Sequence, residues 1–195
     1  MDSGMRWNKH LTVLCKRLST VLFQLRCLSN VISEYYLRIC YYAIFHSVMT
    51  YGILLWGGSS HINRVFILQK KAIRILAKTK NTESCRAVFK KYKIMTLISC
   101  YIFECLLYIK KQDPQKQNQV HSHDTRNNAC LRLPLCRLSR TYDSFINISY
   151  KLFNTLPYTL RTLNFKLFRS KLKTLLTCNV FYTIEEFLAF NFNVS

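Results

Sequence analysis

Five basic side chains are the residues of this sequence best suited to a chemical task. Arg64, Lys71, Arg74 and Lys78 fall within one arc of a helix with 3.6 residues per turn, and Lys70 flanks them. Lysine and arginine bind phosphate groups because their cationic groups donate charge-assisted hydrogen bonds to phosphate oxygens. We therefore predict that these residues contact a phosphate backbone.

The charge of this segment is not balanced locally. No aspartate or glutamate interrupts residues 61–81. A solvated helix face ordinarily mixes both signs, because opposite charges four residues apart stabilise a helix and like charges destabilise it. A face of one sign costs stability and therefore favours an anionic partner. A basic face without any partner is the alternative that the sequence leaves open.

The whole chain shares this imbalance. Its 195 residues include 29 lysines and arginines against 9 aspartates and glutamates, which gives a formal net charge of +20. Such a field attracts polyanions over a screening distance of about 8–10 Å at physiological salt. Nucleic acid is the first candidate partner and an anionic membrane surface is the second. No small-molecule substrate is predicted.

The sequence lacks the residue clusters that catalysis of phosphoryl transfer would need. Asp2, Asp113, Asp124 and Asp143 are isolated and form no Asp-Asp pair, whereas two-metal phosphoryl transfer needs clustered carboxylates. The four glycines form no phosphate-binding loop. We therefore expect no catalytic residue, no metal site and no cofactor in this chain.

Cysteine and histidine offer two weaker alternatives. Four residues could hold a zinc ion, although the usual pair of cysteines two residues apart is missing: His121, His123, Cys130 and Cys136. Cys85 beside Arg86 could act as a nucleophile with a lowered pKa, but no partner base can be identified. We expect a core or interface thiol there. Most of the cysteines are expected to be core residues in a reducing intracellular compartment, nuclear or cytoplasmic.

Apolar residues at helical spacing predict the elements that hold these side chains. The basic residues lie opposite an apolar face on one helix, which should begin after Ser59 and Ser60. That apolar face comprises Ile62, Val65, Phe66, Ala72, Ile73 and Leu76. Further helices are predicted at residues 11–25, 84–91, 97–111, 142–156 and 163–176, with a short one capped by Thr183. The predicted fold class is mainly α: a helical bundle, a short extended segment and a second small group of helices.

The segment 34–49, with Ser33 as its N-cap, is apolar on nearly every side and predicts the central helix of the bundle. Residues 39–58 carry no formal charge, a length that could span a bilayer. However, Tyr42, His46 and Thr50 form a polar stripe that lipid would penalise and a protein groove would accept. We expect a buried helix, with a membrane span as the alternative. Three aromatic residues are assigned to the core rather than to base stacking: Tyr41, Phe45 and Tyr51.

The composition divides the chain into three parts. Residues 1–111 predict the helical bundle, residues 112–128 a polar linker or loop, and residues 129–195 a C-terminal helical extension. Alternating leucine and arginine over residues 130–138 predict an extended piece, and Pro134 excludes a central strand there.

Several short motifs support a more specific interpretation. The most specific is Leu68-Gln69-Lys70-Lys71-Ala72-Ile73-Arg74. A downstream motif combines His121 with Thr125-Arg126-Asn127 and Leu133-Pro134, and other matching stretches are residues 7–11, 16–19, 41–47, 51–53, 56–57, 83–86 and 89–91. Over essentially the whole chain, these motifs resemble the region that follows the palm in jockey-like non-LTR retrotransposon reverse transcriptases.

The resemblance implies a helical thumb, which in these RNA-directed DNA polymerases follows the palm and holds the template–primer duplex by its backbone. The implied partners are an RNA/DNA template–primer and the missing palm domain. The family's paired catalytic aspartates lie in the palm, so nothing here corresponds to them or to the Mg²⁺ of the parent polymerase. Residues 1–7 look like the end of the last palm strand and the turn after it, which predicts a truncated reading frame, a decayed element copy or a gene-model fragment. Arg126 is assigned a structural or phosphate-binding role. A functionless remnant of a mobile element and a basic membrane-associated helical protein are the alternatives.

Overall fold

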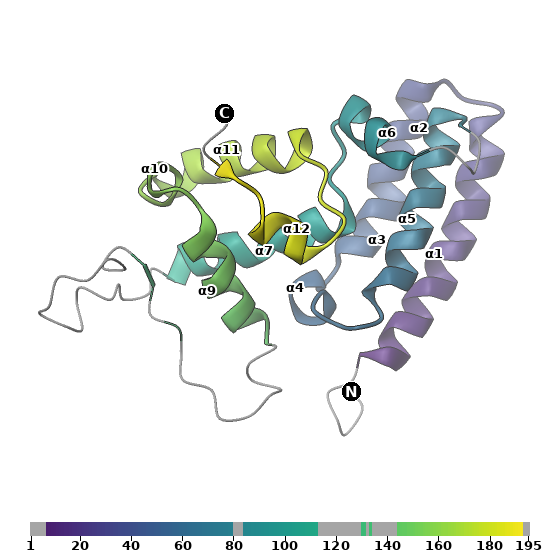
Figure 1. The fold of residues 1–195 in the computed structure, drawn as a ribbon. Helices are drawn as coiled ribbons and strands as arrows, with labels where there is room; N and C mark the ends of the chain where they lie inside the picture. Colours follow the sequence, from purple (N-terminus) through teal and green to yellow (C-terminus); the bar gives the residue numbers. More distant parts are fainter. Residues whose placement is uncertain (1–6, 80–83, 113–129, 132, 134–143, 193–195) are drawn as a thin grey trace, which may run out of the picture.

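The computed structural model describes residues 7–79, 84–112, 130–131, 133 and 144–192, and these residues are mainly helical, as predicted (Figure 1). The helices are α1 (Asn8–Ser29), α2 (Glu34–Cys40), the π-helix η1 (Tyr41–His46), α3 (Ser47–Thr50), α4 (Ile53–Trp56), α5 (Ile62–Ala77), α6 (Cys85–Tyr92), α7 (Leu97–Gln112), α9 (Phe145–Thr155), α10 (Tyr158–Arg161), α11 (Phe165–Cys178) and α12 (Ile184–Leu188).

Helices α1 and α5 lie side by side and rise from the same end of the molecule (Figure 1). Each buries the apolar face that its sequence predicts. In α1 the buried residues include Leu11, Leu14, Leu18, Leu22 and Leu25. In α5 they include Val65, Phe66, Ala72, Ile73 and Leu76. Burying a leucine or isoleucine contributes about 1.5–3 kcal/mol relative to exposure, so this contact fixes the two helices against each other.

The predicted central helix is interrupted by a π-helical segment. Leu37, Tyr41, Phe45 and Met49 are all fully buried and recur every fourth residue, a longer period than the 3.6 residues of an α-helix. The wider turn of η1 keeps these four side chains in line. The predicted burial of this segment holds for the line of these four side chains and not for its outward face. That face leaves three apolar side chains exposed: Tyr35, Tyr36 and Ile39.

Tyr51 was wrongly assigned to the core, whereas Tyr41 and Phe45 were assigned correctly. The side chain of Tyr51 is 80% exposed. Helix α3 ends at Thr50, and Gly52 then adopts φ 63°, a left-handed conformation that turns the chain at low cost. Trp56 takes the buried position instead, and its Nε1 donates to the Tyr51 carbonyl at 2.9 Å.

Buried Gln69 joins α5 to η1 and to the start of α7. Its Nε2 donates to the Tyr41 hydroxyl at 3.1 Å and to the Met95 carbonyl at 3.0 Å. Its Oε1 accepts from the Leu97 amide at 2.7 Å. The first amides of a helix have no partner within that helix. Gln69 therefore satisfies one orphan donor of α7 while satisfying its own polar atoms.

Helix α7 connects the two halves of the described chain. It packs against α4 and α5 from the first half and against α9 and α11 from the second, and one cluster of buried residues runs from α1 to α12. The division at residues 111 and 129 stays a prediction. Residues 113–128 and most of the predicted extended piece lie outside the described residues. Within that piece, Leu131 exchanges two hydrogen bonds with the Asn154 side chain, at 2.8 and 3.0 Å.

Two helix starts differ in detail from their predictions. Ser33 occupies the N-cap of α2 without a side-chain hydrogen bond, and α5 begins after His61 rather than after the serine pair. Thr183 caps α12 as predicted, accepting from the Glu186 amide at 3.1 Å. Among the described residues no single helix is long and apolar enough to cross a membrane. The bent pair α6 and α7 passes that test on length and composition, at an angle of 51°.

Candidate nucleic-acid interface

The five predicted basic residues of α5 separate into two groups. Arg64, Lys71 and Lys78 are exposed, whereas Lys70 and Arg74 are half-buried. Arg64 and Lys71 are seven residues apart within α5, which keeps them on one side of the helix with a drift of about 20°. Lys78 is the C-cap of α5 in the left-handed conformation, at φ 51°, so it lies just beyond this helical repeat. Three of the five residues are therefore open to solvent, and two are turned toward the protein.

The open side of α5 borders α1. Arg64 Nη1 donates to Asn8 Oδ1 at 3.5 Å and to Thr12 Oγ1 at 3.4 Å, so the guanidinium lies against the first turns of α1. Both hydrogen bonds are long and therefore weak. Since a guanidinium carries five N–H donors, most of them stay available to a ligand.

Helix α1 adds basic residues that the sequence analysis did not single out. Lys16 and Arg26 are exposed. Helices α1 and α5 run in the same direction from the contact between Arg64 and Thr12. Residues that lie the same number of positions beyond this contact are therefore at the same level along the two helices. Arg26 follows Thr12 by fourteen residues, a rise of about 21 Å, and Lys78 follows Arg64 by fourteen residues but lies just beyond the C-terminal end of α5.

We call this surface the α1–α5 face; it comprises Lys16, Arg26, Arg64, Lys71 and Lys78. Neither α1 nor α5 contains an aspartate or glutamate. Within the described residues, none of the five pairs with a carboxylate. The sequence does carry a signal for Lys16 and Arg26: acidic residues are absent from α1 as well as from α5.

The other side of α5 is covered by the segment between α11 and α12. Lys70 Nζ lies 4.3 Å from the centre of the Phe66 ring and 4.4 Å from that of Tyr182. Arg86 Cζ lies 4.2 Å from the Tyr182 ring. A cation over an aromatic face is attracted by the ring quadrupole, with about 0.5–2 kcal/mol per contact. We call Lys70, Arg86, Tyr182 and Glu186 the Tyr182 cluster.

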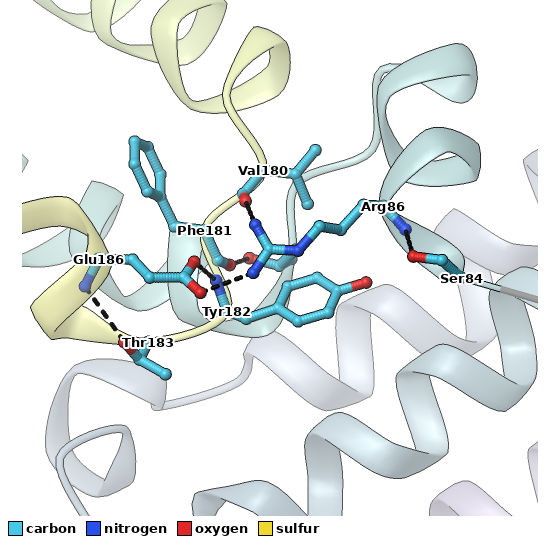
Figure 2. A network of polar contacts seen from close by, with 8 residues as sticks. Ser84, Arg86, Val180, Phe181, Tyr182, Thr183 and Glu186 are labelled. Atoms are coloured by element: carbon cyan, nitrogen blue, oxygen red, sulfur yellow. Dashed lines mark hydrogen bonds and ion pairs between the residues drawn. The ribbon is translucent and has the colours of Figure 1, made fainter. Parts of the chain in front are cut away.

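A hydrogen-bond network holds this covering segment in place (Figure 2). Arg86 pairs with Glu186 at 2.6 Å and donates to the Val180 carbonyl at 3.1 Å. The other Glu186 oxygen accepts from the Tyr182 amide at 2.8 Å. Although burial acts to raise the pKa of Glu186, the Tyr182 amide and Arg86 bring it below its ordinary value. The carboxylate is therefore held ionised by the contacts that fold the segment.

Cys85 lies beside this cluster and is buried. Burial raises the pKa of its thiol, an effect that the nearby charges of Arg74 and Lys70 only partly offset. Its Sγ is 3.8 Å from the Lys70 carbonyl, to which the thiol can donate. A protonated thiol is a poor nucleophile, so the structure favours the predicted core role. Arg74 lies close enough to Cys85 and Tyr182 to affect the pKa of both.

The remaining candidates cannot be placed. Arg126 lies outside the described residues, as do His121, His123 and Cys136 of the possible zinc set. Among the described residues, no group of three or more histidine, cysteine or acidic side chains could hold a metal ion.

Comparisons of this chain with protein-family models, with curated proteins and with solved structures found no match. The function must therefore be argued from the chemistry of the site and from the resemblance of its motifs.

Proposed function

We propose that this chain binds the sugar–phosphate backbone of nucleic acid along the α1–α5 face, without catalysis. The observation that carries the proposal is that two adjacent helices, with the C-cap of α5, carry five exposed cations and contain no acid. Like charges on neighbouring helices repel one another, and counter-charges on the same helices would remove that cost. A polyanion supplies the missing counter-charge from outside.

The geometry suits contact with a backbone rather than recognition of bases. The cations extend over about 21 Å, a length over which one nucleic-acid strand carries about six phosphates. Lysine and arginine contacts to phosphates position a duplex without reading its sequence. Binding should therefore be insensitive to sequence and strongly dependent on salt, because each contact releases condensed counterions.

The motif resemblance points to the particular nucleic acid. A thumb of a jockey-like retrotransposon reverse transcriptase would hold an RNA–DNA template–primer by its shape, mainly through phosphates and hydroxyls. In this proposal the chain is a non-catalytic part of such an RNA-directed DNA polymerase, and the Mg²⁺ chemistry belongs to the palm of the parent enzyme. A remnant of a mobile element that binds nothing is the competing proposal.

A salt titration with matched variants tests the proposal. The triple variant Arg64→Gln, Lys71→Gln and Lys78→Gln should bind an RNA–DNA hybrid about 10²–10³-fold more weakly at 0.1 M salt. It should also lower the slope of log K against log salt by roughly 2–3. The matched control carries Arg17→Gln, Lys90→Gln and Lys91→Gln. All three cations are exposed, Arg17 lines a pocket with Ser47 and Val48 of α3, and the two lysines belong to α6. The control removes the same net charge.

Equal losses in the two triple variants would show that only the overall charge attracts the hybrid, and would contradict a site on this face. A flat salt dependence of the unmodified chain would favour the remnant instead. Circular dichroism spectra of the variants and the unmodified chain should superimpose, because all six positions are exposed.

A further inference from the structure

A second polar site lies beside α3, where three parts of the chain converge. A pocket of about 180 Å³ opens between the η1–α3 segment, α7 and α11. We call it the His46 pocket. Its polar lining comprises His46, Thr50, Glu104, Arg169 and Lys173. His46 and Thr50 belong to the polar stripe that was predicted to face a protein groove, and both line the His46 pocket.

The positive charge of the pocket comes from α11. Arg169 and Lys173 are one helical turn apart, so they lie on the same face of the helix. The single carboxylate of the lining, Glu104, comes from α7. Burial raises the pKa of Glu104, and Arg169 opposes that rise only in part. Two cations therefore face one carboxylate whose negative charge is itself disfavoured.

His46 provides the second, independent observation. Its Nδ1 is buried and has no hydrogen-bond partner among the described residues. A buried polar atom without a partner loses its hydrogen bonds to water without replacement, and such atoms are rare in folded proteins. Burial, assisted by the charge of Lys173, lowers the pKa of His46 to about 4. At neutral pH the ring is therefore uncharged. Because Nδ1 is enclosed by the protein, Nε2 is the ring nitrogen that can donate a proton to a ligand in the pocket.

The neighbouring groups narrow the choice of ligand. The Thr50 hydroxyl already donates to the His46 carbonyl at 2.8 Å, so its proton is not available. Cys100 is fully buried, and burial raises the pKa of its thiol to about 12, so it stays neutral. The free donors of the pocket are therefore a guanidinium, an ammonium and an imidazole N–H. This set matches an acceptor with several oxygens and negative charge.

We propose that the His46 pocket binds one phosphate-type oxyanion, held by Arg169 and Lys173 and by a hydrogen bond from His46 Nε2–H. The volume supports a small ligand, since drug-sized ligands occupy about 300–1,000 Å³. The anion can be free phosphate or a single phosphodiester of a nucleic acid, because both present the same oxygens. The site does not depend on the α1–α5 face, which lies on other helices.

The test uses the full chain, with inorganic phosphate as the probe and the imidazole resonances of His46 followed by NMR. Phosphate should shift the His46 resonances saturably. It should also raise the pKa of His46, because a nearby anion stabilises the imidazolium form. Arg169→Gln and Lys173→Gln should each weaken phosphate binding at least tenfold. Glu104→Gln should strengthen it severalfold, since it removes the one opposing carboxylate.

Lys171→Gln is the matched control, because it removes an exposed lysine of the same helix that does not line the pocket. It should leave phosphate binding unchanged. A loss as large as that of Lys173→Gln, or His46 resonances that do not move at saturating phosphate or oligonucleotide, would overturn the proposal. A higher phosphate affinity of Glu104→Gln cannot arise from a damaged fold. This variant therefore tests the proposal even if the α11 variants are destabilised.

A short single-stranded oligonucleotide forms the second arm. If inorganic phosphate shifts His46 on its own, the pocket accepts the free anion. If only the oligonucleotide does so, the ligand is a backbone phosphodiester. The triple glutamine variant of the α1–α5 face should keep its response to inorganic phosphate. Failure of one proposal can thus be recognised separately from failure of the other.

Discussion

Helix α5 presents cations on two sides, and the surroundings of the two sides differ. On the side shared with α1, Arg64, Lys71 and Lys78 are exposed and no acid stands on either helix. On the opposite side, the Lys70 ammonium lies over the rings of Phe66 and Tyr182, which contact each other. The same residue types, from one stretch of sequence, thus face solvent in one direction and an aromatic cluster in the other.

The difference shows that a basic motif does not by itself define a binding site. A cation that contacts an aromatic ring or a carboxylate within the protein stabilises the fold, and this contact makes it less available to an external ligand. A cation without such a neighbour keeps its donors for a ligand. The two sides of α5 should therefore respond oppositely to substitution: the Tyr182 cluster in stability, the α1–α5 face in binding.

The largest expected effect is on the covered side. Tyr182→Ala should lower the free energy of unfolding by about 2–3 kcal/mol, less than the 3–5 kcal/mol of a fully buried aromatic residue, because Tyr182 is half-buried. Urea unfolding measures this loss, and affinity of the folded fraction for an RNA–DNA hybrid should not change. Tyr158→Ala, at a 60% exposed tyrosine, is the control and should stay within about 0.5 kcal/mol. Weakened hybrid binding by Tyr182→Ala would break the distinction between the two sides.

A carboxylate placed on the open side should separate stability from binding. Ile67 is 52% exposed, three residues after Arg64 and four before Lys71. Ile67→Glu should raise the free energy of unfolding by a few tenths of a kcal/mol through these helix pairs. It should weaken hybrid binding about tenfold, which corresponds to about 1.4 kcal/mol. Ile67→Gln has a similar shape and no charge, and should leave binding unchanged; tenfold weaker binding by this control would point to shape rather than charge.

Two adjacent lysines give the sharpest contrast. Lys71→Gln should weaken binding at 0.1 M salt about fivefold and lower the salt slope by about 1, without a change in stability. Lys70→Gln makes the same chemical change one residue earlier. It should alter binding less than twofold and lower the free energy of unfolding by about 0.5–1 kcal/mol through its lost ring contacts. Similar binding losses for both would mean that the single arc predicted from the sequence describes the site better than the two groups do.

The smallest expected effect is a pH dependence of the Tyr182 cluster. The pKa of Glu186 is lowered in the folded chain, so its stabilising contribution is present above the ordinary glutamate pKa and is lost as the pH falls through the lower, folded value. The ion pair is partly exposed and solvent screens it, so the contribution should be below about 1 kcal/mol. Urea unfolding at several pH values should show this loss, and Glu186→Gln should remove it. An unaltered pH dependence in that variant would assign the effect to another carboxyl.

The helices themselves could be predicted because their signals are local. The leucines of α1 and the apolar face of α5 repeat at helical spacing, and both faces are buried as expected. The π-helix was missed, although Leu37, Tyr41, Phe45 and Met49 recur every fourth residue. Apolar residues on nearly every side of this segment hide that four-residue period in the sequence. Tyr51 was misplaced because a left-handed Gly52 ends the helix before its side chain can reach the core.

The candidate sites were predictable only in part. The cations of α5 stand out in the sequence, but their division into two groups depends on Tyr182, more than a hundred positions away. The network of Arg86 and Glu186 likewise joins residues 100 positions apart. The His46 pocket combines side chains from three separate segments, and no spacing rule connects them.

The helical composition and the excess of positive charge follow from the sequence alone, because helical periodicity acts within a turn or two and charge is a sum over residues. Which cations are exposed and which are covered depends on the tertiary structure. That choice depends on where distant segments pack, and burial of apolar side chains drives this packing without regard to the charges beside them. The two faces of α5 differ because Tyr182 packs beside one of them and α1, which carries no acid, borders the other.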